Sequence, residues 1–300
     1  MHALVLAAAA LHRFAAPLAA LRPRCAVACL NRLLLEPSEC AGDGTATLPA
    51  DDPRTQHVRV VLRARDGASI RAGVLDRGSS DEATVCWLPG GADDPPGLRL
   101  ALGEPSRLRP AERPRIDLLL AMPRPLQFGR LLPMVASLGV GTVYVTAAAK
   151  TEKSFFSSHL LREDQAAQQQ LRAALAGDTA VPRVVVDRRL RSLLRDRLPQ
   201  YGRRLVAHPR REGRDARTVG EALSGLASSQ AAIDAGEGQD GAGSGPRVLL
   251  AVGPEGGWDE PAELELLREH GFEEVTLGSR TLRTDVAVVS LLSVAHASLG

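Results

Sequence analysis

The stretch Val248–Asp285, VLLAVGPEGGWDEPAELELLREHGFEEVTLGSRTLRTD, decides the fold class of this chain. Its apolar run, Val248–Val252, enters the glycine-rich turn Gly253–Gly257, and a predicted helix follows directly. The expected strand Glu274–Leu277 then enters a second turn, Gly278–Thr284, which opens the last predicted helix. A glycine-rich turn between a strand and a helix directs backbone N–H groups at one spot. Two such turns at the carboxyl ends of neighbouring strands predict a single crevice for a small polar ligand.

Strand and helix patterns alternate upstream of this stretch. Ile116–Ala121 is an apolar run expected as a buried strand, Leu126–Leu138 has helical spacing, and Thr142–Thr146 is a second strand. This alternation predicts a parallel α/β sheet. The final segment, Val286–Leu299, is apolar at nearly every turn, which predicts a helix buried on more than one side.

The first third of the chain has a different pattern, with short strands separated by glycine-containing turns. The expected strands are Leu33–Leu35, His57–Leu62, Ser69–Leu75 and Ala83–Leu88. Short strands at this spacing predict a small β-barrel. The patterns divide the chain into a leader at 1–29, a barrel at 30–103, a proline-rich linker at 104–114 and an α/β domain at 115–300. A segment poor in bulky residues, 220–246, predicts a flexible surface insertion in the last domain.

Composition limits the classes of partner. The net charge of +2 over 300 residues is almost neutral, so a nucleic-acid-binding surface must concentrate its positive charge locally. Two arginine-rich stretches, Arg54–Arg65 and Arg188–Arg217, are the candidates. The four cysteines form no C-x-x-C pair and have no histidines at zinc-ligand spacing, so we expect reduced thiols and no metal site. No stretch reaches the roughly eighteen apolar residues of a membrane span, and we expect no membrane partner.

The N-terminal segment is free of acidic residues until Glu36 and contains Arg13, Arg22 and Arg24 among alanines and leucines. Such a start is typical of an organelle transit peptide, which predicts a mitochondrial or chloroplast location. Two alternatives stay open: a secretory signal, from the apolar run Ala3–Leu11, and a start codon placed upstream of the true beginning. Without a transit peptide, the expected location is the cytoplasm.

The order GPEGGW, acidic helix, Gly271-Phe272 and LGSRTLRTD strongly resembles the RsmE family of 16S ribosomal RNA uracil-N3 methyltransferases, members of the SPOUT superfamily. The segment NRLLLEP at 31–37 is similar to the family's opening, and RTQHVRVVLRARDGASIR at 54–71 is similar to its H-I-x-x-V-L-R…G-D stretch. The resemblance therefore covers about residues 30–300. Asp285 stands where the family usually has Glu, and 168–177 lacks the usual Glu-Gln-x-x-Arg pattern.

The resemblance implies a trefoil-knotted SPOUT methyltransferase domain, preceded by a PUA-like RNA-binding barrel, in a homodimer. It implies transfer of a methyl group from S-adenosylmethionine to N3 of a uridine in 16S-type ribosomal RNA, with the small ribosomal subunit as partner. N3 lies on the Watson–Crick edge, so the base must be unpaired or extruded. Two alternatives stay open: another SPOUT methylation, for example at a ribose 2′-oxygen, and a catalytically silent RNA-binding assembly factor.

The resemblance also implies site residues. The expected cofactor-binding residues are His208, Gly253, Pro254, Glu255, Gly256, Gly257, Leu277, Gly278, Leu282, Arg283 and Thr284. Arg283 is the expected catalytic cation, because a guanidinium stays protonated and offers two donors to charge developing on uracil. The alternatives for Arg283 are an ion pair with Asp285 or a helix cap, and Asp285 itself is expected as a general base or a cap.

RNA contacts are expected from cations exposed on the barrel. They are Arg32, Arg54, His57, Arg59 and Arg63. Such side chains bind phosphates or bases. The alternative for each of these arginines is a solvated strand face.

Overall fold

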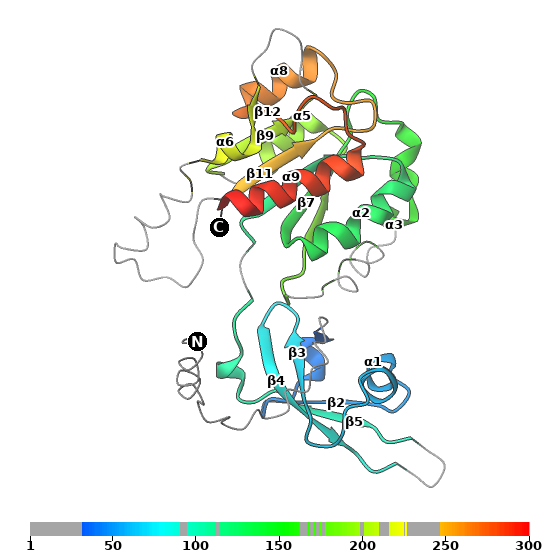
Figure 1. Cartoon of the computed structure of the whole chain (residues 1–300). Helices are drawn as coiled ribbons and strands as arrows, with labels where there is room; N and C mark the ends of the chain where they lie inside the picture. Colours follow the sequence, from blue (N-terminus) through cyan, green and yellow to red (C-terminus); the bar gives the residue numbers. More distant parts are fainter. Residues whose placement is uncertain are drawn as a thin grey trace, which may run out of the picture.

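The computed structural model describes residues 32–90, 95–111, 114–162, 178–198, 201–209, 216–224 and 247–299, with single positions at 167, 171, 175 and 226. The expected leader at 1–29 and most of the expected insertion at 220–246 lie outside these residues. Figure 1 shows two bodies of structure, which we call the small domain and the large domain. The sheet of the small domain lies within residues 33–101, and that of the large domain within residues 116–276.

The small domain contains a five-stranded sheet in the order β1-β3-β4-β5-β2. Its strands are β1 (Leu33–Leu35), β2 (Thr45–Leu48), β3 (Ser69–Val74), β4 (Gly78–Trp87) and β5 (Leu98–Ala101). Strand β1 pairs parallel with β3, and the other pairs are antiparallel. The domain also has short helical segments: η1 (Pro37–Glu39), α1 (Pro53–Gln56), η2 (His57–Val61) and η3 (Pro105–Arg107). Membership of the PUA-like class stays a prediction from the resemblance.

The expected strand His57–Leu62 is wrong, because His57–Val61 forms the helix η2, which follows α1 directly. Helix α1 begins with two start signals: Asp52 accepts a hydrogen bond from the Arg54 backbone N–H at 2.8 Å, and Pro53 occupies the first helical position. The buried residues of the two consecutive helices, Thr55 of α1 and Val58 of η2, are three residues apart, which is the spacing of one helix face. The partial alternation of apolar residues favoured a strand, but the helix start signals outweigh it.

The large domain has a seven-stranded sheet in the order β10-β12-β9-β11-β6-β7-β8, and all its pairs are parallel. Its strands are β6 (Ile116–Ala121), β7 (Val140–Thr146), β8 (Arg183–Val186), β9 (Arg203–Ala207), β10 (Arg217–Thr218), β11 (Val248–Val252) and β12 (Phe272–Thr276). The predicted parallel α/β sheet is therefore confirmed. Strands β6 and β11 are buried at every position, as expected for central strands covered on both faces.

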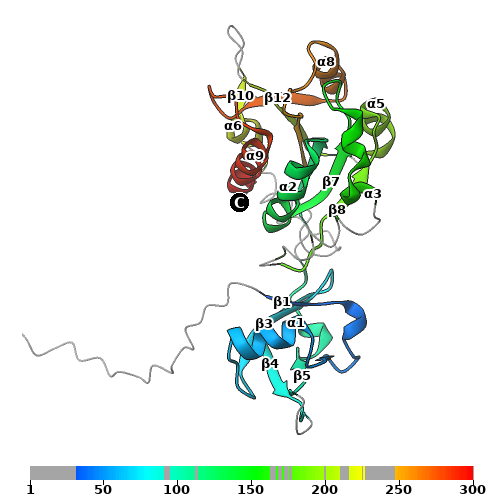
Figure 2. The ribbon, with the colours of Figure 1, turned by 90° about the vertical axis from the view of Figure 1, so that its right-hand side faces the viewer.

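Helices cover both faces of this sheet. They are η4 (Lys153–Ser157), α2 (Pro125–Ser137), α3 (His159–Arg162), α5 (Leu190–Ser192), η5 (Leu193–Arg197), α6 (Val219–Leu223), α8 (Ala262–Glu269) and α9 (Thr284–Leu299). Figure 2 shows α2 and α9 on one side and α5 on the other. Successive β6 residues divide accordingly: Leu118 packs in the cluster that contains Leu292 of α9, and Leu119 in the cluster that contains Leu267 of α8.

The buried residues of helix α9, including Val288, Leu291 and Leu292, follow one another at the three- and four-residue spacing of a single helix face, and Val286 and Val294 on other faces are exposed. The expectation that this helix is buried on more than one side is therefore wrong for the single chain. The trefoil knot stays a prediction from the resemblance. Among the described helices, none is both long and apolar enough to cross a membrane.

A buried carboxylate ties together the amino ends of the central strands. Asp117 of β6 is fully buried and accepts hydrogen bonds from the Thr142 backbone N–H at 2.7 Å and from the Tyr201 hydroxyl at 2.5 Å. It also forms an ion pair with Arg247, just before β11. Asp117 therefore links β6 to β7 and to the residues just before β9 and β11.

Candidate active site

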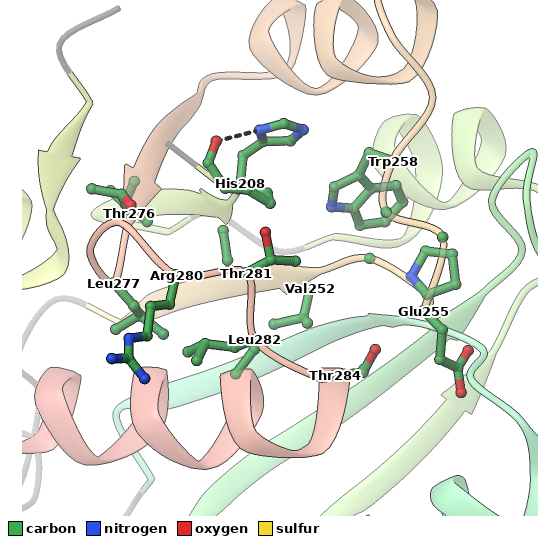
Figure 3. A pocket seen from close by; sticks show the side chains of 18 of the residues that line it. His208, Val252, Glu255, Trp258, Thr276, Leu277, Arg280, Thr281, Leu282 and Thr284 are labelled. Carbon is green, nitrogen blue, oxygen red and sulfur yellow. Dashed lines mark hydrogen bonds between the residues drawn. The ribbon is translucent and has the colours of Figure 1, made fainter. Parts of the chain in front are cut away.

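A cavity of about 300 Å³ lies at the carboxyl edge of the large sheet (Figure 3). Most of its wall comes from the loops that follow β9, β11 and β12, which are adjacent strands. Lys150, in the loop after β7, completes it. A crevice at the carboxyl ends of parallel strands is the usual ligand site of open α/β sheets. The crevice predicted from the two glycine-rich turns is present.

The glycine turn after β11 is sterically tight at its first residue, Gly253. A Cβ atom on Gly253 would lie 3.0 Å from the Trp258 backbone nitrogen and 3.2 Å from the carbonyl carbon of Gly257. Gly257 has a φ of 71°, and its N–H closes the turn onto the Pro254 carbonyl at 2.8 Å. A Cβ on Gly256 would instead meet the flexible Lys150 side chain at 3.1 Å. The turn therefore presents bare backbone to the cavity.

The turn after β12 forms the facing wall. The Thr276 hydroxyl accepts from the Gly278 N–H at 3.1 Å and donates to the Gly278 carbonyl at 3.0 Å. Gly278 has a φ of 118°, which strongly favours glycine. Leu282 follows along the wall, and Thr284 opens α9.

The β9 loop contributes His208, whose side chain is only 11% exposed. Its Nε2 lies 2.9 Å from Glu260 Oε1, and its Nδ1 lies 3.0 Å from the Pro209 carbonyl. Both contacts hold the imidazole ring in one orientation at the upper wall seen in Figure 3.

Ten of the eleven expected cofactor-binding residues line this one cavity. They are His208, Gly253, Pro254, Glu255, Gly256, Gly257, Leu277, Gly278, Leu282 and Thr284. Arg283 is the exception: its side chain is 67% exposed and pairs with Asp285 at 2.9 Å. The ion pair that the sequence left open as an alternative for Arg283 is the arrangement found.

Sequence reasoning missed several lining residues, including Lys150, Trp258, Arg280 and Thr281. Trp258 directly follows GPEGG, so its neighbourhood was a usable signal. Its side chain is 1% exposed, and Nε1 has no hydrogen-bond partner among the described residues. In Figure 3 the indole nitrogen lies on the edge of the ring nearer Thr281 and His208. Nothing in the sequence pointed to Lys150, because only the fold brings the β7 loop to the glycine turn.

The Glu263 carboxylate connects the loop after β7 to the end of the glycine turn. Glu263 of α8 accepts from the Ala149 N–H and from the Asp259 N–H, each at 2.7 Å. Lys150 Nζ lies 3.4 Å from the Trp258 carbonyl. The β7 loop is thereby held against the glycine turn.

One of the cations expected to bind RNA on the small domain, Arg32, is buried. Arg32 is 8% exposed and donates to the Ala72 and Ser80 carbonyls and to Asp81, so the expectation that it is exposed is wrong. It lies before β1 and ties β3 to β4, which the sequence did not reveal because these partners are distant along the chain.

Arg54 is also engaged within the protein. Its guanidinium donates to Glu39 at 2.6 Å and to Asp52 at 2.7 Å, and also to the Leu34 carbonyl. Hydrogen bonding to Arg54 holds the pKa of each carboxyl below its ordinary value. His57, Arg59 and Arg63 lie on or just after η2 instead of on a strand.

These features define the class: an α/β protein with a glycine-lined ligand site at the carboxyl edge of a parallel sheet. The model of the RNA methyltransferase domain family matches residues 111–296, more than half of the chain. The chain belongs to this family.

Curated relatives and solved structures agree. A ribosomal RNA small subunit methyltransferase E of Treponema pallidum is 26% identical over 278 residues, which span 90% of this chain and 91% of that protein. The crystal structure of a ribosomal RNA small subunit methyltransferase E from Neisseria gonorrhoeae, bound to S-adenosylmethionine, is 21% identical with a TM-score of 0.62. It covers 89% of this chain and 97% of its own. A Legionella pneumophila methyltransferase in complex with the same cofactor has a TM-score of 0.57, at 20% identity, and covers 89% of this chain and 98% of its own.

Proposed function

We propose that this protein transfers a methyl group from S-adenosylmethionine to N3 of a uridine in small-subunit ribosomal RNA. The observation that carries the proposal is the glycine-walled cavity, which lies within the residues that the RNA methyltransferase family model matches. The names of the curated relatives support small-subunit RNA as substrate, and the neighbours bound to S-adenosylmethionine support the cofactor. The N3 position follows from the resemblance to the RsmE family.

The cavity suits this cofactor, which supplies the electrophilic methyl group when bound. Its volume of about 300 Å³ is within the range of small-ligand sites. A Cβ on Gly253 would collide with the backbone of Gly257 and Trp258, so glycine there keeps the tight turn that lines the cavity. Trp258 Nε1 is a buried donor with no acceptor among the residues that the structure describes. A buried unpaired donor is costly, so an acceptor on the ligand would stabilise it.

We assign Arg283 and Asp285 to the chemistry at the base. Methylation forms an N3–CH₃ bond as the S–CH₃ bond breaks, which leaves S-adenosylhomocysteine, and the N3 proton passes to solvent water. Arg283 is exposed in a turn that contributes Gly278, Leu282 and Thr284 to the cavity wall, and it can donate to a uracil oxygen as negative charge develops. Asp285 accepts from both Arg283 and the Val286 N–H, at 2.9 and 3.0 Å, so we assign it to orienting Arg283 and not to accepting the proton.

The small domain offers a surface for RNA along 57–65, with the sequence HVRVVLRAR and no acidic residue. Arg59 and Arg63 supply positive charge, while Val60 and Val61 are 63% and 64% exposed. Cations beside exposed apolar side chains fit a nucleic acid, which offers both phosphates and bases. We define this segment as the basic ridge and assign to it the RNA contacts of the small domain.

One experiment tests the reaction. Small ribosomal subunits that lack the modification are incubated with the protein and S-adenosylmethionine, and the methylated nucleotide is mapped by mass spectrometry. We expect one N3-methyluridine. A 2′-O-methyl group would support the alternative SPOUT reaction, and the absence of any transfer together with an absence of cofactor binding would support the silent assembly factor.

Arg283→Ala tests the catalytic assignment in the same assay. We expect the single-turnover rate, at saturating RNA and cofactor, to fall by roughly 10² because charge on the base loses its stabilising donor. Arg268→Ala is the matched control, since Arg268 is an exposed arginine that also pairs with one carboxylate, Glu274, but does not line the cavity. An unchanged rate for Arg283→Ala would remove Arg283 from the mechanism.

A further inference from the structure

The turn between β3 and β4 of the small domain contacts the large domain. Its tip residue, Asp76, donates its backbone N–H to the Thr179 carbonyl at 2.8 Å, and its Oδ1 accepts from the Val181 N–H at 2.9 Å. Thr179 and Val181 lie just before β8 of the large domain. One small-domain residue therefore bonds to two large-domain residues, Thr179 and Val181, which are two positions apart in sequence.

The backbone of Asp76 is shaped for this contact. Its φ of 56° lies in the left-handed region, which Asp and Asn enter more readily than other residues with a side chain. The preceding residue, Leu75, is 5% exposed and belongs to the hydrophobic core of the large domain, with Val181 packed against the same core. An apolar anchor thus lies directly beside the two hydrogen bonds.

The surroundings of the turn are packed tightly. Thr179 is fully buried, and a Cβ on Gly73 of β3 would lie 2.4 Å from its methyl carbon. The buried Arg32 ties β3 to β4 on the small-domain side. In the linker, Arg109 exchanges two backbone hydrogen bonds of 2.8 Å with Ser79 of β4. The β3–β4 turn is therefore held in place by contacts within the small domain and by the linker.

The contact of Asp76 with Thr179 and Val181 lies at the amino end of β8, whereas the cavity lies at the carboxyl edge of the same parallel sheet. We infer that Asp76, with Thr179 and Val181, forms an interdomain latch that fixes the small domain relative to the cavity and so selects which nucleotide of a bound RNA reaches it. Asp76 is a positioning residue in this inference, which rests on the proposed RNA methylation. A structured RNA that spans both domains needs the latch, but a short RNA that occupies only the cavity does not.

Three variants of one residue separate the parts of the latch. Asp76→Ala removes the Oδ1 acceptor and disfavours the positive φ. Asp76→Gly keeps that backbone conformation and the N–H donor but removes the acceptor, and it serves if the alanine variant folds poorly. Asp76→Asn keeps both an acceptor oxygen and tolerance of the left-handed region, so it is the conservative control.

The readouts are Val181 amide exchange, cofactor affinity, and single-turnover methylation of small subunits and of a short single-stranded RNA. For Asp76→Gly and Asp76→Ala we expect faster Val181 exchange, unchanged cofactor affinity, and at least about tenfold slower methylation of small subunits, because a displaced reacting group loses rate steeply. Methylation of the short RNA should not change, and Asp76→Asn should behave like the unmodified protein.

Two results would overturn the latch: small subunits methylated at the original rate despite faster Val181 exchange, or both RNAs slowed equally, which would mean damage to the cavity. If the unmodified protein methylates neither RNA, the proposed function fails instead. Val181 exchange still reports then whether the two domains are held together.

Discussion

Gly253 carries the tightest steric constraint at the cavity, because its missing side chain faces backbone and not a movable side chain. We expect Gly253→Ala to lower S-adenosylmethionine affinity at least tenfold, equivalent to about 1.4 kcal/mol, since the turn must shift to admit the methyl group. Calorimetric titration measures this. Gly256→Ala is the matched control: its Cβ meets the Lys150 stem, which can move, so the affinity should change less than about threefold. If folded Gly253→Ala binds S-adenosylmethionine as tightly as folded Gly256→Ala does, the assignment of this turn to the cofactor is contradicted.

Trp258 is the residue whose chemistry the sequence did not show. Replacing it with Phe, or with the sulfur isostere β-(3-benzothienyl)alanine, removes the N–H and keeps an aromatic ring. If Nε1 donates to the bound cofactor, both should raise the dissociation constant about fivefold, as expected for one hydrogen bond of about 1 kcal/mol. Titration of each folded protein measures the change. The isostere has the shape of tryptophan, so tight binding by it would show that the N–H contacts no ligand.

At the scale of elements, Arg54 connects α1 to η1 through Glu39 and to its own N-cap, Asp52. Hydrogen bonds to Arg54 lower the pKa of Glu39 from 4.5 and that of Asp52 from 3.8. Because the folded pKa values lie below the unfolded ones, this stabilisation is fully present above about pH 4.5 and is lost as the pH falls through the folded values. We expect Arg54→Met to unfold the small domain at a higher pH in an acid titration followed by circular dichroism.

The control for this titration is Arg107→Met, because Arg107 pairs with Glu104 on the surface, where both side chains are more than 70% exposed. It should leave the acid midpoint unchanged. A midpoint for Arg54→Met equal to that of the control would show that Arg54 is free for RNA, as the sequence alone suggested.

The elements also show what sequence could and could not predict. Strand β11 has the predicted bounds, and α2 begins and ends one residue earlier than predicted, because an apolar run or stripe bounded by turn residues specifies a buried element locally. Helix α1 was missed because its cap signal competed with a short alternating pattern. The ion pairs of Arg32 and Arg54 depend on residues brought together only by folding, so exposure could not be judged from the chain.

At the scale of the whole molecule, the sequence predicted the parallel α/β sheet and one cavity formed by its loops, because parallel strands place successive turns at one edge. It did not predict Lys150 at the cavity or Asp76 between the domains. Each of these residues acts across elements that are distant in sequence, and neither carries a motif. The parts of the site that the sequence predicted were therefore local turns. The parts that it did not predict were contacts between domains or between loops.

An exposed apolar face on the large domain bears on its oligomeric state. Helices α2 and α9, which pack side by side, expose Leu126, Met134, Val286 and Val294 at 38–68%. Contiguous exposed apolar side chains mark interaction surfaces, and a self-complementary face produces a two-fold dimer. We propose that this face forms the homodimer implied by the resemblance.

We expect Met134→Glu combined with Val294→Glu to convert the protein from two chains to one, because dimer formation would bury two unpaired charges in each subunit. Light scattering after size-exclusion chromatography measures the mass. Val186→Glu is the control, since Val186 is 44% exposed at the outer strand β8, away from these helices. The control should keep the mass of the unmodified protein. If the double variant also keeps a two-chain mass while remaining folded, the α2 and α9 face is not the dimer interface, and the exposed valines of the basic ridge become the next surface to test.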